Sequence, residues 1–280
     1  MRFRSLLAAL LATAAGLCAA APANTRDEII ARLREQLPLI PAADYVLGAA
    51  AFDAELRAKV ELNADSGAQV VAAGKKLWIA KFKDGRTLAG CFPNGGKRVA
   101  ATYPQYDPKL KRVITLETAV NQCLKSHNEA LYEPLDPATM GAVMAYLRSL
   151  SDGRKVAVRM PAAAQDRFEQ GRRMYFSRMG QRNFACASCH LQGAGKRYGS
   201  RGSGTWDGEV PLSPAVGQAA HWPVIRDGKP VTLQARMREC LELMGAAPFP
   251  AGSEELNDLE YFLTYLANDT VMKANVWRGW

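Results

Sequence analysis

The sequence lacks long apolar runs after its first twenty or so residues. The 280-residue chain begins MRFRSLLAALLATAAGLCAAAPA, in which two arginines precede an apolar run from Leu6 to about Ala20 and small residues follow. This layout is typical of a secretory signal peptide, and the run is too short for a comfortable membrane span. We therefore expect removal of residues 1–23, no membrane span in the mature chain, and export to the periplasm, an oxidising compartment where disulfides persist.

The sequence also lacks any array of basic side chains interleaved with aromatic ones. The chain has 36 Lys and Arg against 27 Asp and Glu, a formal charge of +9, but only 8% aromatic residues. Proteins that bind nucleic acid gather basic residues on one face, and single strands stack on aromatic rings. Because the basic residues here are scattered, we expect no nucleic acid and favour an anionic substrate or an acidic partner.

Cysteine is scarce, and one of the six, Cys18, falls within the predicted signal peptide. Two others lie in FACASCH, residues 184–190, as Cys186 and Cys189, directly before His190. C-x-x-C-H is the attachment motif of a c-type haem. Its thiols bond the porphyrin and its imidazole becomes the proximal ligand of the iron. The motif predicts one covalently bound haem c.

The sequence around this motif disfavours three other cysteine sites. A thioredoxin-like redox pair follows a strand and opens a helix, whereas here the loop LQGAGKRYGSRGSG follows. A zinc site needs another pair of ligands nearby, and none is present. A disulfide across two residues is strained. Covalent haem remains the best interpretation.

An internal repeat relates the two halves of the chain. GRTLAGC, which ends at Cys91, matches GQRNFAC, which ends at Cys186. Downstream, LETAVNQC ends at Cys123 as LQARMREC ends at Cys240. The shared order of these landmarks predicts two copies of one unit, and a cytochrome c domain fits it with an N-terminal helix, a haem-binding turn, a distal-ligand segment and a C-terminal helix.

Each copy is expected to begin and end with a helix. GKKLW, residues 74–78, and GRRMY, residues 171–175, are interpreted as helix openings. Apolar residues with the spacing of a helix packed on a core are Val143, Tyr146, Leu147 and Leu150 in the first copy, and Leu259, Phe262, Leu263 and Leu266 in the second. The predicted fold is all-α, with a helical leader over 24–63 and two tandem cytochrome c-like domains over 64–155 and 156–280. A linker is expected at 153–161.

The first copy lacks the residues that would hold a haem. Asn94 stands in place of the second thiol and Gly95 in place of the histidine, and His127 is expected to be a surface histidine. By the repeat, Cys91 and Cys123 occupy the attachment and distal-ligand positions, so a disulfide between them is our hypothesis, with two free thiols as the weaker alternative. Closing this loop would contribute roughly 3–4 kcal/mol in the chain-entropy model.

This pairing leaves Cys240 alone where a distal ligand is expected. Methionine is the ordinary sixth ligand of a cytochrome c, and Met237 and Met244 flank Cys240 within about one helical turn. Cys240 is favoured because Cys123 matches it across the repeat, and because a free thiol in an oxidising compartment is lost to side reactions unless it is ligated or used. An intermolecular disulfide is a further alternative.

Arg236 lies four residues before Cys240 in a helix predicted over Thr232–Met244 and closed by Gly245. Residues four apart share a helix face. A guanidinium beside a sulfur favours the thiolate and can hold an anion with its fork of donors. A solvated helix face is the alternative, and we assign Arg238 to it. In the same half, His221 and Trp222 are expected to close the haem pocket.

These residues resemble those of a known family. GQRNFACASCH and HWPVIRDGKPVTLQARMREC, with CFPNGG in the first half, are similar to the SoxA family, the larger subunits of the SoxAX cytochromes of bacterial sulfur oxidation. The resemblance covers most of the mature chain and is to the single-haem type, in which a cysteine pair replaces the N-terminal haem. It implies that Cys240 is the second iron ligand and the active-site sulfur, found as a persulfide, and that Arg236 positions the substrate anion.

The resemblance also implies the reaction and the partners. As an L-cysteine S-thiosulfotransferase, such a protein couples thiosulfate oxidatively to a cysteine of the SoxYZ carrier protein. Two electrons leave through the haem to SoxX, a smaller cytochrome c that forms a heterodimer with this chain. The competing interpretations are a two-domain electron carrier with His–Met ligation and a non-catalytic scaffold with a structural haem. The R-x-x-x-C pair argues against both.

Overall fold

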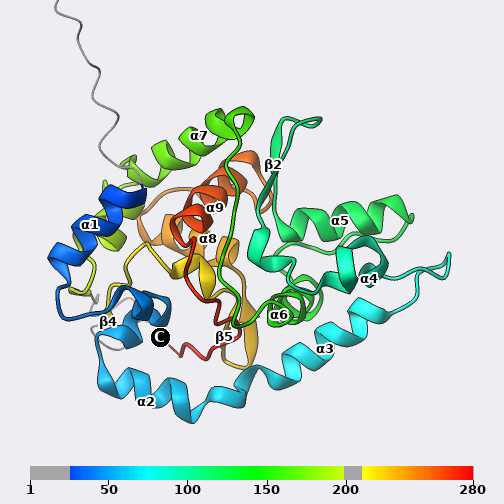
Figure 1. Cartoon of the computed structure of the whole chain (residues 1–280), viewed down its shortest axis with the longest axis horizontal. Coiled ribbons are helices and arrows are strands. Elements are labelled where there is room, and N and C mark those ends of the chain that lie inside the picture. The colour runs from blue at the N-terminus through cyan, green and yellow to red at the C-terminus, as the bar shows by residue number, and fades with distance from the viewer. Residues whose placement is uncertain (1–25, 199–209, 280) are drawn as a thin grey trace, which may run out of the picture.

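Helices dominate the computed structural model, which describes residues 26–198 and 210–279 (Figure 1). The α-helices are α1 (Arg26–Gln36), α2 (Ala54–Leu62), α3 (Ala68–Ile79), α4 (Leu88–Cys91), α5 (Leu116–Ser126), α6 (Ala142–Ser149), α7 (Gln165–Phe176), α8 (Leu233–Leu243) and α9 (Glu254–Leu266). Within the described ranges, no helix is both long and apolar enough to cross a membrane. The predicted signal peptide lies outside these ranges.

Shorter elements connect these helices. The 3₁₀ and π turns are η1 (Ala42–Ala51), η2 (Ala64–Gly67), η3 (Pro93–Gly96), η4 (Ala100–Thr102), η5 (Pro137–Gly141), η6 (Ala162–Ala164), η7 (Ser188–Gln192) and η8 (Gln218–Ala220). Three antiparallel two-stranded ladders join β1 (Gln105–Asp107) to β2 (Arg112–Ile114), β3 (Arg197–Tyr198) to β4 (Val210–Pro211), and β5 (Val224–Arg226) to β6 (Lys229–Val231). The mostly helical structure agrees with the predicted all-α class, to which these ladders are a small addition.

Local sequence fixes the ends of α8, the helix that carries Arg236 and Cys240. The Thr232 hydroxyl accepts a hydrogen bond from the Ala235 N–H at 3.3 Å, which satisfies a donor left open at the helix start. At the other end Gly245 has a φ of +73°, a left-handed conformation that glycine adopts at little cost. The prediction of a helix over Thr232–Met244 is confirmed to within one residue at each end.

Two crossed helix pairs form the centres of the two halves, α3 against α6 and α7 against α9. Gly74 and Gly171 lie at the crossings, where their backbones approach the partner helix closely. The prediction that GKKLW and GRRMY open their helices is wrong, because α3 and α7 begin six residues before these glycines. The glycines serve the crossing and do not mark a helix start.

The leader packs on the second half of the chain (Figure 1). Ile29 and Leu33 of α1 are buried, and Arg26 donates to the Asn268 carbonyl. Near the end of α1, the Gln36 amide donates to the Ala194 carbonyl at 2.9 Å. The first part of the leader thus covers the half that carries C-x-x-C-H, and α2 and α3 then lead to the other half.

The segment 153–161, expected to be a linker, is packed against the residues that follow α9. Val156 and Val158 are buried. The Val156 N–H donates to the Thr270 carbonyl, and the Val156 carbonyl accepts from the Asp269 N–H, both at 3.0 Å. These contacts bind the segment into the structure along its length.

Candidate functional site

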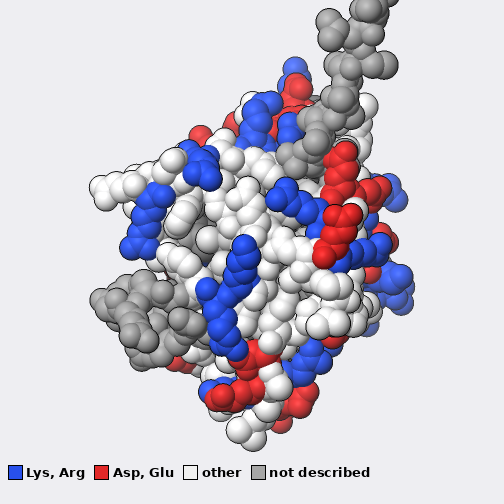
Figure 2. Space-filling view, turned by 90° about the vertical axis from the view of Figure 1, so that its left-hand side faces the viewer, with Lys and Arg blue, Asp and Glu red and all other residues white. Residues whose placement is uncertain are grey.

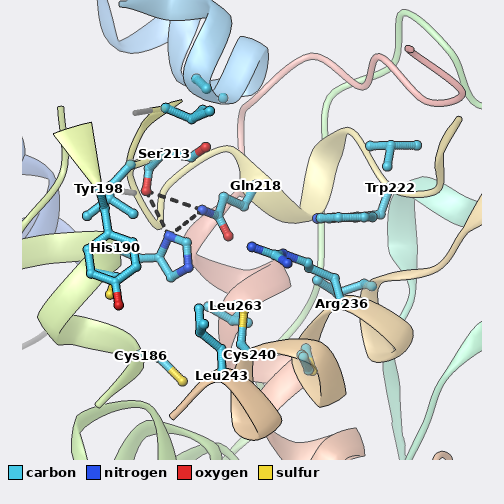
Figure 3. A pocket seen from close by; sticks show the side chains of 18 of the residues that line it. Cys186, His190, Tyr198, Ser213, Gln218, Trp222, Arg236, Cys240, Leu243 and Leu263 are labelled. Atoms are coloured by element: carbon cyan, nitrogen blue, oxygen red, sulfur yellow. Dashed lines mark hydrogen bonds between the residues drawn. The ribbon is translucent and has the colours of Figure 1, made fainter. Parts of the chain in front are cut away.

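A largely apolar cavity lies in the second half, where η7 faces α8 and α9 (Figure 3). The predicted haem-site residues Cys186, Cys189 and His190 line it, as do Arg236 and Cys240. Apolar lining residues include Tyr175, Leu212, Val224, Leu233, Leu241, Leu259 and Leu263. The fold therefore brings together five site residues that span 55 positions in the sequence, from Cys186 to Cys240.

His190 is oriented by a backbone carbonyl behind it. Its Nδ1 lies 2.9 Å from the Ser213 carbonyl oxygen, and the Gln218 side-chain amide lies 2.7 Å from the same nitrogen. Because Nδ1 is hydrogen-bonded on that side, the other ring nitrogen, Nε2, faces the cavity (Figure 3). Burial lowers the pKa of His190 to about 4, so the imidazole is neutral at pH 7. A neutral ring whose second nitrogen donates to a carbonyl is the usual state of a metal-ligating histidine.

The two thiols of the motif lie on the same helical turn as the histidine. Burial raises the pKa of Cys186 to about 12 and also raises the pKa of Cys189. Both are therefore protonated thiols at neutral pH rather than nucleophilic thiolates, as suits addition to porphyrin vinyl groups better than redox exchange. The cavity, the thiol pair and the oriented imidazole together fit a covalent haem c.

Three sulfur side chains of α8 and its C-terminal end line the cavity: Met237, Cys240 and Met244. Met237 and Met244 are buried, 7% and 6% exposed, and Cys240 is partly exposed. The distal-ligand position therefore holds the predicted cysteine together with both alternative methionines.

Arg236 belongs to a charged group at the edge of this cavity. Its Nη1 lies 3.0 Å from Glu239 Oε2, and Arg226 Nη1 lies 3.2 Å from the same oxygen. Burial lowers the pKa of Arg236, but the Cys240 sulfur and the Glu239 carboxylate outweigh burial, and its pKa is raised. The guanidinium stays charged, and Figure 3 shows it pointing toward the space between His190 and Cys240.

Two arginines that line the cavity were missed by the sequence analysis. Arg226 ends β5, and Arg278 reaches the cavity from the C-terminal segment, where its backbone N–H donates to the Ile225 carbonyl at 2.8 Å. Burial lowers the pKa of Arg278 to about 10, which still leaves it protonated at pH 7. The only signal for Arg278 was its place between two tryptophans. Among the residues that the structure describes, Arg226, Arg236 and Arg278 are thus the cationic side chains that line the cavity.

The two residues expected to close the pocket both line it. His221 is 5% exposed and Trp222 8% exposed, and His221 Nδ1 lies 2.8 Å from the Val46 carbonyl of the leader. Burial lowers the pKa of His221 to about 3, so this ring is neutral as well.

Arg238, assigned to a solvated face, is partly buried and donates to the Phe249 carbonyl.

Cys91 and Cys123 lie in the other half and form a disulfide with Cα atoms 6.0 Å apart. The disulfide joins α4 to α5.

The prediction that His127 is a surface histidine is wrong. Its side chain is only 11% exposed, and one of its ring nitrogens lies within 4.8 Å of both sulfurs. Sequence reasoning missed this because His127 is far from Cys91 in the sequence, and only the fold brings α5 beside α4.

Charge on the surface agrees with the sequence pattern. Figure 2 shows Lys and Arg side chains distributed among uncharged and acidic ones on the face that carries α1, rather than gathered in one broad basic patch. In the loop LQGAGKRYGSRGSG that follows C-x-x-C-H, Arg197 pairs with Asp53 of the leader at 2.7 Å, while Arg201 lies outside the described residues.

The fold and the motif are those of a c-type cytochrome. A family model described as "SoxA/TsdA, cytochrome c domain" matches residues 73–156. Membership of this cytochrome c family implies covalent haem c, and the C-x-x-C-H motif that would hold it lies outside the match, at 186–190. The solved structure of SoxXA from P. pantotrophus superposes with a TM-score of 0.67 at 25% identity, over 76% of this chain and 79% of that one.

Curated relatives cover most of the chain. The L-cysteine S-thiosulfotransferase subunit SoxA of Chlorobaculum tepidum is 36% identical over 84% of this chain and 80% of its own length. The protein of the same description from Allochromatium vinosum is 34% identical over 89% of this chain and 88% of its own length. The chain belongs to the SoxA family of sulfur transferase subunits.

Proposed function

We propose that this chain joins thiosulfate to a cysteine thiol of a SoxYZ-like carrier protein, with Cys240 as the sulfur that accepts and passes on the substrate group. The observation that carries the proposal is that Arg236 and Cys240, one turn apart on α8, line the same cavity as Cys186, Cys189 and His190. When bound, one haem c would accept one electron at a time, so the two electrons that sulfur–sulfur bond formation releases would pass through it in succession to the partner subunit.

The residues of the site divide the work. Cys186 and Cys189 would hold the haem covalently, and His190, fixed by the Ser213 carbonyl, would be one axial ligand. Cys240 would be the other. As a nucleophile that carries the sulfur adduct, it divides one difficult step into two. The persulfide form of Cys240 rests on the family resemblance.

Arg236 would hold the substrate anion beside Cys240. A charged guanidinium presents a planar fork that matches an oxyanion and offsets repulsion between two negatively charged sulfur species. Glu239 fixes Arg236 from behind through the 3.0 Å contact. The neighbouring Arg226 and Arg278 keep this side of the cavity cationic, which favours anion entry.

The first half would be a second cytochrome c-like domain that carries no haem, so that the chain holds one. The match of the family model to residues 73–156, which contain no C-x-x-C-H, supports this assignment. The crossing of α3 with α6 in the first half resembles the crossing of α7 with α9 in the second half, and this likeness supports the tandem arrangement. The Cys91–Cys123 disulfide lies at the repeat positions of a haem-attachment cysteine and a distal ligand.

The protein would act in the periplasm, as its predicted signal peptide indicates, in a heterodimer with a small SoxX-like cytochrome c. The likeness to a chain of the SoxXA structure supports that partner. Electrons would pass to it from the haem of this chain.

The test replaces one sulfur at a time in holoprotein purified with its partner subunit. Cys240→Ala should keep covalent haem on Cys186 and Cys189 and abolish thiosulfate-dependent turnover. Met237→Leu and Met244→Leu are the matched controls, because both methionines line the same cavity. Full turnover in Cys240→Ala with an unchanged haem spectrum would refute the catalytic proposal.

An electron carrier with His–Met ligation is the second candidate function, since two methionines lie at the distal position. It predicts a different result in the same series. One methionine variant, and not Cys240→Ala, would then change the axial-ligand spectrum.

A further inference from the structure

We propose that Cys91, Cys123 and His127 form a redox-controlled zinc site, which is closed while the two cysteines are in their disulfide and binds zinc once a dithiol reductant has opened it. The site lies in the half without C-x-x-C-H and is separate from the cavity described above.

The three side chains are already gathered. Cys91 Sγ, Cys123 Sγ and one ring nitrogen of His127 all lie within 4.8 Å of one another. Two thiolates and one imidazole are a common zinc donor set, with a fourth position for water or another ligand. Zinc–sulfur distances of about 2.3 Å and zinc–nitrogen distances of about 2.0–2.1 Å also place the donor atoms within 4.8 Å of one another, once reduction lets the two bonded sulfurs move apart. Small side-chain shifts are therefore enough.

His127 has the kind of carboxylate partner that a metal-ligating histidine often has. Its Nδ1 lies 2.7 Å from Asp84 Oδ2, and the other carboxylate oxygen, Oδ1, accepts the Arg86 N–H at 2.9 Å. With Nδ1 engaged, Nε2 keeps the open lone pair, and a carboxylate behind the ring fixes its tautomer and raises its basicity. Phe82 packs on the imidazole with ring centroids 5.1 Å apart.

A reductant can reach the disulfide. Cys91 is exposed, whereas Cys123 is buried at 5% exposure. Attack by an external thiolate therefore falls on the Cys91 sulfur, with Cys123 as the leaving group. A second thiolate of the dithiol then displaces Cys91, so the protein gains two electrons and two protons as two thiols while the dithiol becomes a cyclic disulfide. Zinc binding releases these two protons.

Zinc would thus hold α4 against α5 in the reduced chain as the disulfide does in the oxidised chain. The two cross-links exclude each other because they use the same sulfur atoms. The site would preserve this part of the fold when thiols are reduced, before oxidation is complete or under reducing stress.

The experiment uses full-length holoprotein, half of it reduced anaerobically with a dithiol that is then removed by desalting. Zn²⁺ is titrated into both samples, and stoichiometry is read by native mass spectrometry and the metal neighbours by zinc X-ray absorption. The reduced protein should bind one zinc with two sulfur neighbours and at least one nitrogen neighbour. The disulfide form should bind none at the same concentration.

Variants assign the ligands. His127→Ala should abolish the one-zinc complex, although it leaves both cysteines able to form the disulfide. Asp84→Asn should weaken binding about 10- to 100-fold, the usual effect of removing the group behind a metal-ligating histidine. Asp65→Asn, at an exposed position, is the matched control. Cys240→Ala should bind zinc as the parent does, which separates this site from the haem cavity.

Several outcomes would overturn the proposal. These are equal binding by the disulfide form, absorption without sulfur neighbours, an unchanged affinity in His127→Ala, or no binding by reduced protein whose haem spectrum and circular dichroism remain native. None of these outcomes depends on thiosulfate turnover, so the experiment tests the zinc site independently of the proposed function.

Discussion

The backbone of Gly171 lies so close to that of Asp258 that a methyl group on Gly171 would come within 2.0 Å of the Asp258 carbonyl oxygen. The same relationship recurs in the first half, where a methyl group on Gly74 would come within 1.9 Å of the Ala142 carbonyl oxygen. Backbone atoms cannot move aside as a flexible side chain can. Each helix pair therefore depends on a glycine at its crossing.

Gly171→Ala should lower the free energy of unfolding by about 1–3 kcal/mol or more, because α7 and α9 must separate to admit the methyl group. Denaturant unfolding of the holoprotein measures this change. Gly90→Ala is the matched control, since its added methyl group would have only the Thr87 hydroxyl at 4.0 Å. Equal stability of the two variants would contradict the assigned role of the crossing.

Arg236→Lys should lower kcat/KM for thiosulfate about 10- to 100-fold, which corresponds to losing one charge-assisted hydrogen bond of roughly 1.5–3 kcal/mol. Lysine keeps the charge but loses the planar fork. Arg238→Lys, two residues along α8, controls for the same substitution outside the cavity. Steady-state kinetics of the heterodimer give the result, and similar losses in both variants would argue against anion binding by Arg236.

Asp258 should make stability depend on pH. Burial raises its pKa to about 7, against partial compensation by Arg167, whose Nη1 lies 3.5 Å away. A raised pKa means that the folded state holds the proton more tightly than the unfolded state. The associated stability is fully present below the ordinary value of 3.8 and is lost as pH rises through about 7.

Across this window the parent protein should therefore lose stability relative to Asp258→Asn, by on the order of 4 kcal/mol at most. Unfolding curves at several pH values for the two proteins give the difference. Asp166→Asn, at an exposed position of α7, controls for the change of side chain. A difference that does not vary with pH would show that Asp258 ionises normally.

Replacement of Cys91 and Cys123 together by alanine should lower the free energy of unfolding by about 2–5 kcal/mol, the usual cost of losing a native disulfide. The haem spectrum should be unchanged, because neither residue lines the cavity. Calorimetry with absorption spectroscopy tests both parts. Loss of haem from this variant would instead show that Cys91 and Cys123 are needed for haem binding.

The sequence was most informative where local chemistry decides the structure. The extent of α8 follows from Thr232 and Gly245, whose capping roles need no tertiary contact. The apolar residues at three- and four-residue spacing likewise predicted α9, where Leu259, Phe262 and Leu266 are buried. C-x-x-C-H predicts a haem because all of its chemistry lies within five residues.

The sequence was least informative where distant segments meet. Arg278 lies 42 residues beyond Arg236, and only the folded tail brings both to one cavity. His127 is 43 residues from its partner Asp84, so no local pattern revealed its support. Helix starts were also missed, because α3 and α7 have no side-chain cap at their first turn.

The docking of the leader on the second half has a kinetic consequence. Arg26 contacts Asn268 and Asp269, which follow it by 242 and 243 residues, and Val46 contacts His221 across 175. Contacts between residues so far apart in the chain form slowly, because a long loop must close before they contribute. The half that carries C-x-x-C-H should therefore acquire its cover late in folding, which keeps the two thiols of the motif accessible for haem attachment until then.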